Sequence, residues 1–226
     1  MNAKCTVRRC LLLALFAFSL AWLANTSRAT VMSFTPSPAD LYDLDHHYSY
    51  SWRIDSISLP TNAVIDSATL TFSNIANWDS TPNMLFGYLL DTATHSGVNT
   101  FQDHPFDEVP VGDITDHFAN GAVIPSLITS STAMTKLFQQ SFTTTPTTYT
   151  FTFTAAELTT LTNYINNGND VALGFDPECH FFNDGVTFCF DYVTPVPEMA
   201  NAIPVFCLVG VAIGFELRRR RSAVKI

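Results

Sequence analysis

Residues 147–154 have the sequence Thr-Thr-Tyr-Thr-Phe-Thr-Phe-Thr, in which aromatic and hydroxyl side chains alternate. Successive side chains of a β-strand point to opposite faces, so this stretch predicts a strand with an aromatic face towards a core and a threonine face towards solvent. One-sided alternation of this kind is typical of antiparallel sheets that pack face to face.

The same period of two recurs on both sides of this stretch. In residues 46–54 one predicted face holds Tyr48, Tyr50, Trp52 and Ile54, and the other holds His47, Ser49, Ser51 and Arg53. Residues 68–73 alternate in the same way, and residues 136–142 are a further predicted strand. Residues 84–90 and 171–175 are more continuously apolar, which predicts central strands buried on both faces.

One helix is predicted after residue 154. Thr154 and Glu157 form a capping box, Leu158, Leu161 and Ile165 form an apolar stripe, and Gly168 is the expected stop. Residues 92–133 are the least regular, with one helical turn expected at 116–120. The predicted fold class is all-β, an antiparallel jelly-roll-like β-sandwich with one crossover helix, flanked by an N-terminal signal peptide and a C-terminal transmembrane sorting helix.

The 226 residues are 47% hydrophobic, and the formal net charge is −9 at pH 7. The length corresponds to one or two domains, and the composition is too apolar for a disordered chain. The acidic residues are concentrated in residues 30–194, where eighteen Asp and Glu residues face only Arg53 and Lys136. A segment this acidic repels phosphate backbones, which excludes nucleic acid as a partner.

Residues 1–29 have the three parts of a secretory signal peptide. Three basic residues precede a thirteen-residue apolar run, 11–23, and Ser27 and Ala29 are the small residues expected at −3 and −1. We therefore predict cleavage after Ala29. An uncleaved anchor helix is the alternative, but thirteen helical residues span only about 20 Å of a hydrocarbon core that is roughly 30 Å thick.

A second targeting segment follows the acidic one. Residues 194–198 are Thr-Pro-Val-Pro-Glu, whose prolines favour an extended spacer. An apolar stretch, 202–215, comes next and is followed by Arg218, Arg219, Arg220 and Arg221. The positive-inside rule predicts that these arginines stay in the cytoplasm and that residues 30–194 lie outside the inner membrane. The stretch is short for a permanent anchor.

This tail resembles the PEP-CTERM sorting signal of exported proteins from Gram-negative bacteria. The resemblance covers residues 195–226 and consists of Val196, Pro197 and Glu198, the short apolar helix and the arginine cluster, in that order. The usual motif is Val-Pro-Glu-Pro, and Met199 stands here in place of the second proline. The resemblance implies capture by exosortase, a membrane-embedded thiol transpeptidase, and transfer to the cell surface or extracellular matrix. A plain single-pass anchor is the alternative.

The segment between the two targeting sequences also resembles β-sandwich domains that are common in PEP-CTERM proteins, through residues 45–52, 67–75, 85–91 and 174–185. That resemblance implies no known activity. The predicted organisation is therefore a signal peptide (1–29), an extracellular β-sandwich domain (30–194) and a sorting tail (195–226).

Two cysteines of residues 30–194, Cys179 and Cys189, flank Asn183-Asp184-Gly185, a sequence typical of hairpin turns. A three-residue loop there would place the two cysteines opposite each other, close enough for a disulfide. A two-residue loop would instead put them on opposite faces. Because exported proteins meet an oxidising environment, we predict a Cys179–Cys189 disulfide.

Carboxylates in the predicted loops could bind calcium, which takes six to eight oxygen ligands. The candidate ligands are Asp43, Asp45, Asp91, Asp107 and Asp176. A solvated acidic surface is the competing interpretation, because Asp is a common turn former. The six histidines have no zinc-binding spacing such as HExxH, so each is expected to be a surface or partly buried residue and not a ligand.

No nucleophile elbow, phosphate-binding loop or dinucleotide fingerprint occurs in the sequence. We expect a non-enzymatic binding or structural role in the cell envelope or extracellular matrix, which the resemblance links to exopolysaccharide. The alternative is a carbohydrate-active enzyme, a glycan hydrolase or lyase, on the same fold. The expected partners are exosortase, exopolysaccharide and, through the C-terminal helix, the membrane. Calcium is the only candidate cofactor.

Processing of the tail, residues 195–226, can be tested by mutation. Pro197→Ala combined with Glu198→Ala should leave export intact but leave an uncut precursor in the inner membrane. Deleting residues 218–221 should also prevent processing, because the tail loses its cytoplasmic stop. Intact-mass measurement of protein from the native host checks both, and a mature wild-type form that still ends at Ile226 would contradict the sorting hypothesis.

Overall fold

The computed structural model describes residues 29–37, 39–106 and 115–194, which belong to one compact unit, residues 28–194. Apart from Ala29, the predicted signal peptide lies outside the described residues. So does the predicted sorting tail, with Val196, Pro197, Glu198 and the arginine cluster 218–221. Among the residues that are described, no helix is both long and apolar enough to cross a bilayer.

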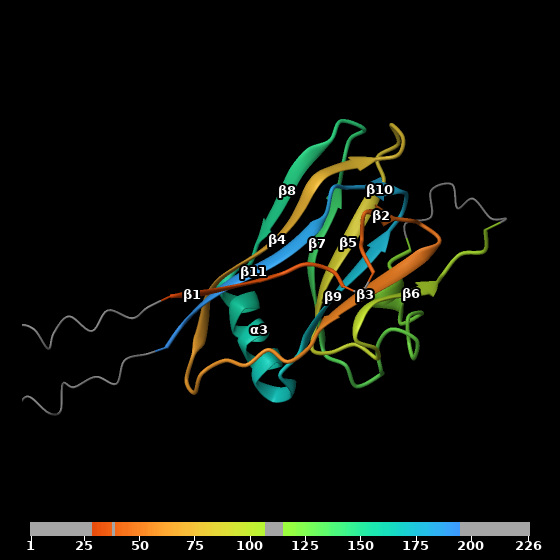
Figure 1. The fold of residues 1–226 in the computed structure, drawn as a ribbon. Helices are drawn as coiled ribbons and strands as arrows, with labels where there is room; N and C mark the ends of the chain where they lie inside the picture. Colours follow the sequence, from red (N-terminus) through yellow and green to blue (C-terminus); the bar gives the residue numbers. More distant parts are fainter. Residues whose placement is uncertain (1–28, 38, 107–114, 195–226) are drawn as a thin grey trace, which may run out of the picture. The chain divides into compact units, whose positions relative to one another are not determined.

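The described chain is mostly β and forms two antiparallel sheets (Figure 1). The six-stranded sheet contains β1 (Thr30–Phe34), β2 (Asp43–Leu44), β4 (Val64–Asn77), β8 (Thr147–Thr152), β10 (Phe181–Phe182) and β11 (Val186–Val193). Its order is β1-β11-β4-β10-β2, with β8 on the other edge of β4. The five-stranded sheet contains β3 (Tyr48–Ile54), β5 (Met84–Leu90), β6 (Gly97–Gln102), β7 (Met134–Ser141) and β9 (Val171–Pro177), in the order β6-β3-β9-β5-β7.

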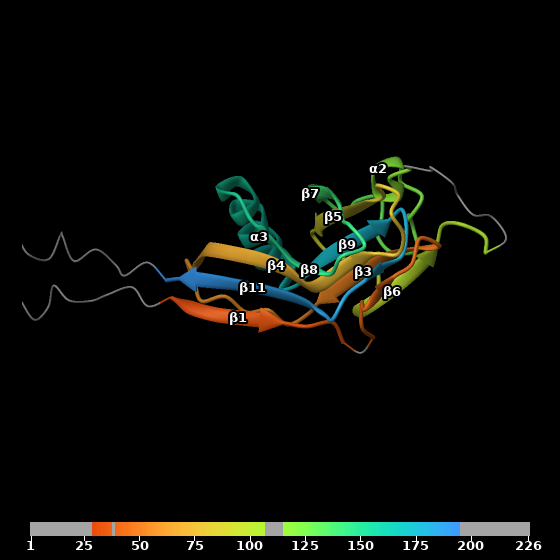
Figure 2. The ribbon, with the colours of Figure 1, turned by 90° about the horizontal axis from the view of Figure 1, so that it is seen from above.

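Side chains from both sheets form the main apolar core. The rings of Phe72 on β4 and Phe175 on β9 meet there, with their centroids 5.5 Å apart. Helix α3 (Ala155–Gly168) leads from β8 in one sheet to β9 in the other (Figure 2). It buries Leu161 and Ile165 in this core. The predicted crossover helix and its capping box are therefore confirmed. The predicted stop at Gly168 is wrong, because Gly168 is the last helical residue and Asn169 is the left-handed C-cap.

A second apolar cluster covers the other face of the five-stranded sheet. Part of this cluster comes from the segment 92–133, which the sequence predicts to be the least regular. Its contributing residues are Phe118 of the short helix α2 (His117–Asn120), Val123, Leu127 and Ile128. Strands β5 and β9 are consequently buried on both faces, as predicted. The polar face of β3 is not a solvent face, because Ser49 and Ser51 are fully buried.

The turn sequence at 183–185 does not form the predicted hairpin. β10 and β11 both pair antiparallel with β4, with Phe181 opposite Asn77 and Val186 opposite Phe72. The chain thus continues along β4 in the same register, with residues 183–185 opposite residues 73–75 between the two pairings. Gly185 has a φ of +130° in this interruption of the ladder, a conformation that favours glycine.

The predicted disulfide is consequently wrong, and Cys179 and Cys189 are both free thiols. Cys189 lies opposite Thr69 on β4, whereas Phe181, two residues after Cys179, lies opposite Asn77. Eight residues of strand span about 26 Å, and a disulfide needs Cα atoms within about 7 Å of each other.

The packing of the second cluster is testable at Gly174 of β9. A Cβ atom there would lie 2.7 Å from the ring of Phe118, which is fully buried. Gly174→Ala should therefore lower the free energy of unfolding by about 1–3 kcal/mol, measured by denaturant titration. In a Phe118→Leu background the same change should cost less, because the clashing ring edge is gone. An unchanged unfolding midpoint would contradict this packing.

Candidate metal centre

The short ladder between β2 and β10 positions the side chains of the candidate site. Leu44 lies opposite Phe181, and both side chains are fully buried in the core. Neighbouring strand residues point to opposite faces, so Asp43, Asp45 and His180 point away from that core. The antiparallel register continues this ladder outward and brings His180 next to Asp45.

Asp45 begins the turn that joins β2 to β3. Its Oδ1 accepts the N–H of His47 at 3.0 Å, and its carbonyl accepts the N–H of Tyr48 at 3.0 Å, as in an Asx-turn. The buried hydroxyl of Tyr50 accepts the N–H of Asp45 at 2.8 Å and donates to the carbonyl of Asp43 at 3.3 Å. A core residue therefore fixes the turn that presents the two adjacent histidines.

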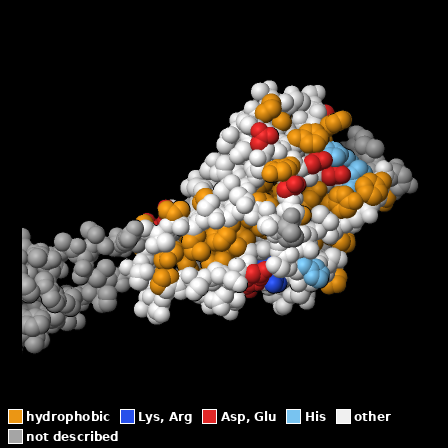
Figure 3. All heavy atoms as spheres, in the orientation of Figure 1, with side chains coloured by type: hydrophobic (Ala, Val, Ile, Leu, Met, Phe, Trp, Pro, Cys, Tyr) orange, Lys and Arg blue, Asp and Glu red, His pale blue; other side chains and the backbone are white. Residues whose placement is uncertain are grey.

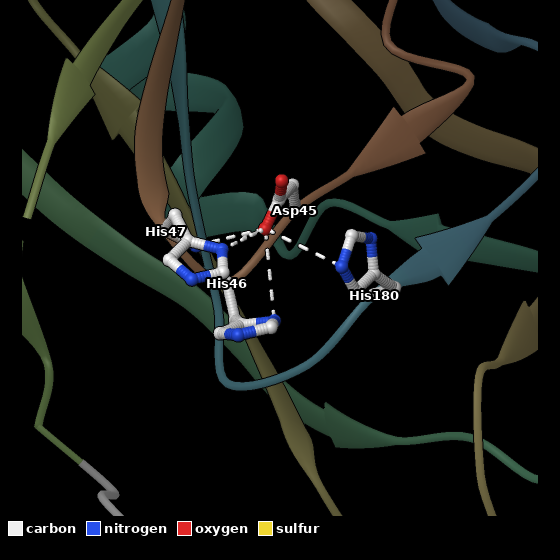
Figure 4. Close-up of side chains that lie close together, drawn as sticks. All are labelled: Asp45, His46, His47 and His180. Carbon is white, nitrogen blue, oxygen red and sulfur yellow. Dashed lines mark hydrogen bonds and ion pairs between the residues drawn. The ribbon is translucent and has the colours of Figure 1, made fainter. Parts of the chain in front are cut away.

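Three imidazole rings converge on Oδ1 of Asp45 (Figure 4). The distances to this oxygen are 2.8 Å from His47 Nδ1, 3.5 Å from His180 Nε2 and 3.6 Å from His46 Nδ1. One donor atom from each of the four residues lies within 4.8 Å of all the others. Tetrahedral Zn²⁺ with bonds of 2.0–2.1 Å holds its ligand atoms about 3.4 Å apart, so small side-chain movements would complete such a site.

The carboxylate of Asp43 contacts His180 through Nδ1, the ring nitrogen that does not face Asp45. Nδ1 of His180 lies 3.0 Å from Oδ1 of Asp43. When Nδ1 donates its proton to this carboxylate, Nε2 keeps its lone pair and faces Asp45. Metal-binding histidines usually have such an outer carboxylate, which fixes the ring tautomer and raises the basicity of the ligand.

The protonation states also favour metal ligation. Burial and the neighbouring His47 lower the pKa of His46, so its ring is neutral at pH 7. Burial opposes ionisation of Asp45, but hydrogen bonds from the His47 main chain and ring outweigh it and lower the pKa of Asp45. Nδ1 of His46 is buried and has no hydrogen-bond partner within the described chain. A neutral imidazole and an ionised carboxylate are the forms that bind metals.

Exposed aromatic rings surround this cluster. Trp78 is 65% exposed and packs its ring against His180 and Phe182, with centroids 6.0 Å away in each case. On the other side the exposed Phe106 lies against His47, at 4.9 Å between centroids. Figure 3 shows apolar, acidic and histidine side chains gathered at this end of the face it displays. The cluster is therefore accessible from solvent beside apolar rings.

The predicted calcium ligands do not meet in one place. Asp43 and Asp45 belong to this histidine cluster, and Asp176 is buried beside His117 on the outer face of the five-stranded sheet. Asp91 follows β5 at the end opposite the cluster and accepts a hydrogen bond from Asn167. Asp107 lies outside the described residues. The four described carboxylates thus do not form a single calcium site.

Sequence spacing missed the histidines because the ligands come from two segments that lie more than 130 residues apart in the chain. One sequence feature could have indicated the site, namely the run Asp45-His46-His47 at the start of a predicted strand. The partner His180 could be recognised only once β10 was paired with β2.

No protein-family model matches this chain, and no curated protein and no solved structure matches it.

Proposed function

We propose that residues 30–194 form an exported domain that binds a divalent transition-metal ion, Zn²⁺ foremost, through Asp45, His46, His47 and His180. The observation that carries this proposal is the convergence of three imidazoles and one carboxylate within 4.8 Å, with Asp43 behind His180. Nitrogen donors favour zinc and copper, whereas calcium requires more oxygens than this cluster offers.

The domain boundaries support the proposed export and exosortase processing. Strand β1 begins at Thr30, directly after the predicted signal cleavage site, and β11 ends at Val193, just before the predicted sorting motif. Thr30 pairs with Tyr192, so the two chain ends of the domain lie side by side (Figure 1). Both proposed cuts would therefore leave every strand of the described residues intact.

We also propose that the two sheets form a jelly-roll-like β-sandwich. The apolar core that they share supports this architecture. Such a domain would act in the cell envelope or extracellular matrix by binding and not by catalysis. The membrane and exosortase would be its partners during sorting.

Zinc binding is testable by thermal unfolding of the chelator-treated full chain, purified in mild detergent. A site that exists only in the folded state stabilises it by about 2.7 kcal/mol at a hundredfold excess of metal over the dissociation constant. For a domain of this size that corresponds to roughly 5–10 °C in melting temperature. Calcium should leave the melting temperature unchanged, and zinc affinity should fall as the pH is lowered, because protons compete with the metal for its ligands.

Variants distinguish this site from adventitious binding. His180→Ala should remove the zinc-dependent shift that belongs to this site, and Asp43→Asn should weaken binding by about 10–100-fold. His95→Ala is the matched control, because His95 is exposed and outside the cluster. Zinc affinity at this site that survives His180→Ala unchanged would contradict the assignment.

A second candidate function, glycan binding, is favoured by the exposed rings of Trp78 and Phe182 next to the carboxylates of the site. Flat aromatic rings offer an apolar face to a sugar while neighbouring polar groups bind its hydroxyls. This candidate would connect the domain to exopolysaccharide.

Binding of the full chain to a glycan array, with a hydrolysis panel run in parallel, tests this candidate. Trp78→Ala should weaken any glycan binding at least several-fold without changing zinc affinity. Thr81→Ala, on the same loop between β4 and β5, is the control. Release of reducing ends by the wild type, lost in His180→Ala, would instead support the carbohydrate-active enzyme.

A further inference from the structure

A second group of metal-type ligands lies on the outer face of the five-stranded sheet. Asp103 and His104 follow the end of β6, and His117 is the first residue of α2. One donor atom from each of these three residues lies within 4.8 Å of the other two. The rings of His104 and His117 meet edge to face, with their centroids 5.1 Å apart.

Two buried carboxylates meet at this point. The side chains of Asp103 and Asp176 are 1% and 3% exposed. Nδ1 of His117 lies 3.3 Å from Asp176 Oδ1 and 3.6 Å from Asp103 Oδ2. Asp103 Oδ2 also accepts the hydroxyl of Ser49 at 2.6 Å, whereas Asp103 Oδ1 is buried and has no hydrogen-bond partner in the described ranges.

No basic side chain of the described ranges compensates these carboxylates. Arg53 and Lys136 are the only Lys or Arg residues there. Arg53 is paired with Asp55 at 2.7 Å, and Lys136 is paired with Asp116 at 2.9 Å. Burying a carboxylate without a cation or a full set of hydrogen bonds costs several kcal/mol, so two of them at one place call for a positive charge.

We propose that Asp103, His104 and His117 hold a second divalent transition-metal ion, adjacent to the first. Asp176 is the positioning residue, because it accepts the main-chain N–H of His117 at 2.6 Å and lies against its ring. The two sites are linked through the main chain, where the N–H of Asp103 donates to the carbonyl of His47 at 3.1 Å. The domain then has two neighbouring metal ions and not one. This inference uses none of the four ligands of the first site and does not rest on the proposed function.

Native mass spectrometry of the full chain, in mild detergent and with buffered Zn²⁺, counts the bound ions. The wild type should bind two zinc ions, and His180→Ala and His104→Ala should each bind one. The double variant should bind none, and His95→Ala should bind two. His104 is half-buried, so its replacement should disturb the fold less than replacement of the buried His117. Near-ultraviolet circular dichroism checks that each variant is folded. In Asp176→Asn the ring of His117 should be held less firmly. The affinity for the second zinc ion should therefore fall by about 10–100-fold.

The outcomes separate this inference from the first site. One zinc that is lost in His180→Ala and kept in His104→Ala overturns the second site and leaves the first. One zinc that is lost in His104→Ala and kept in His180→Ala supports the second site and overturns the first. Two zinc ions retained in a folded His104→Ala variant also overturn the second site, and a wild type that binds no zinc overturns both.

Discussion

Antiparallel pairing along β4 is the interaction on which this domain depends. β8, β10 and β11 pair directly with β4, and β1 and β2 join the sheet through β11 and β10. Because β10 and β11 follow one another along the same strand, one end of β4 receives the last residues of the domain and the other receives His180. The same register separates the two cysteines. It also places the histidine cluster of Asp45 and His180 at the far end of β4 from Val193.

This placement has a functional consequence if, as proposed, the chain is exported and processed at a sorting tail. β4 runs from Val64, opposite Val193, to Asn77, opposite Phe181. Thirteen residues of extended strand measure about 43 Å. A domain held at its C-terminal end would therefore present the histidine cluster and its aromatic rim away from the point of attachment, where a soluble ligand or a matrix polymer can reach them.

Scarcity of basic residues in the described chain supports the two proposed metal sites. Most proteins neutralise buried carboxylates with arginine or lysine, but the described chain has only two such residues and both have other carboxylate partners. Five of the six histidines lie instead next to carboxylates or to one another at one end of the domain. Imidazole and carboxylate side chains together can bind a divalent cation, which supplies the positive charge that these buried carboxylates lack.

The sequence by itself determined the local structure. Alternation in residues 147–154, the apolar runs at 84–90 and 171–175 and the capping box at 154–157 each predicted an element that is present, because periodicity and end-capping act over a few residues. Only the tertiary structure decided what depends on distant pairing. It buried Ser49 and Ser51, replaced the expected hairpin at 183–185 by a continuous run along β4, and joined His180 to Asp45. Strand register and the cover of a sheet face are settled by contacts far apart in the chain, which local spacing does not contain.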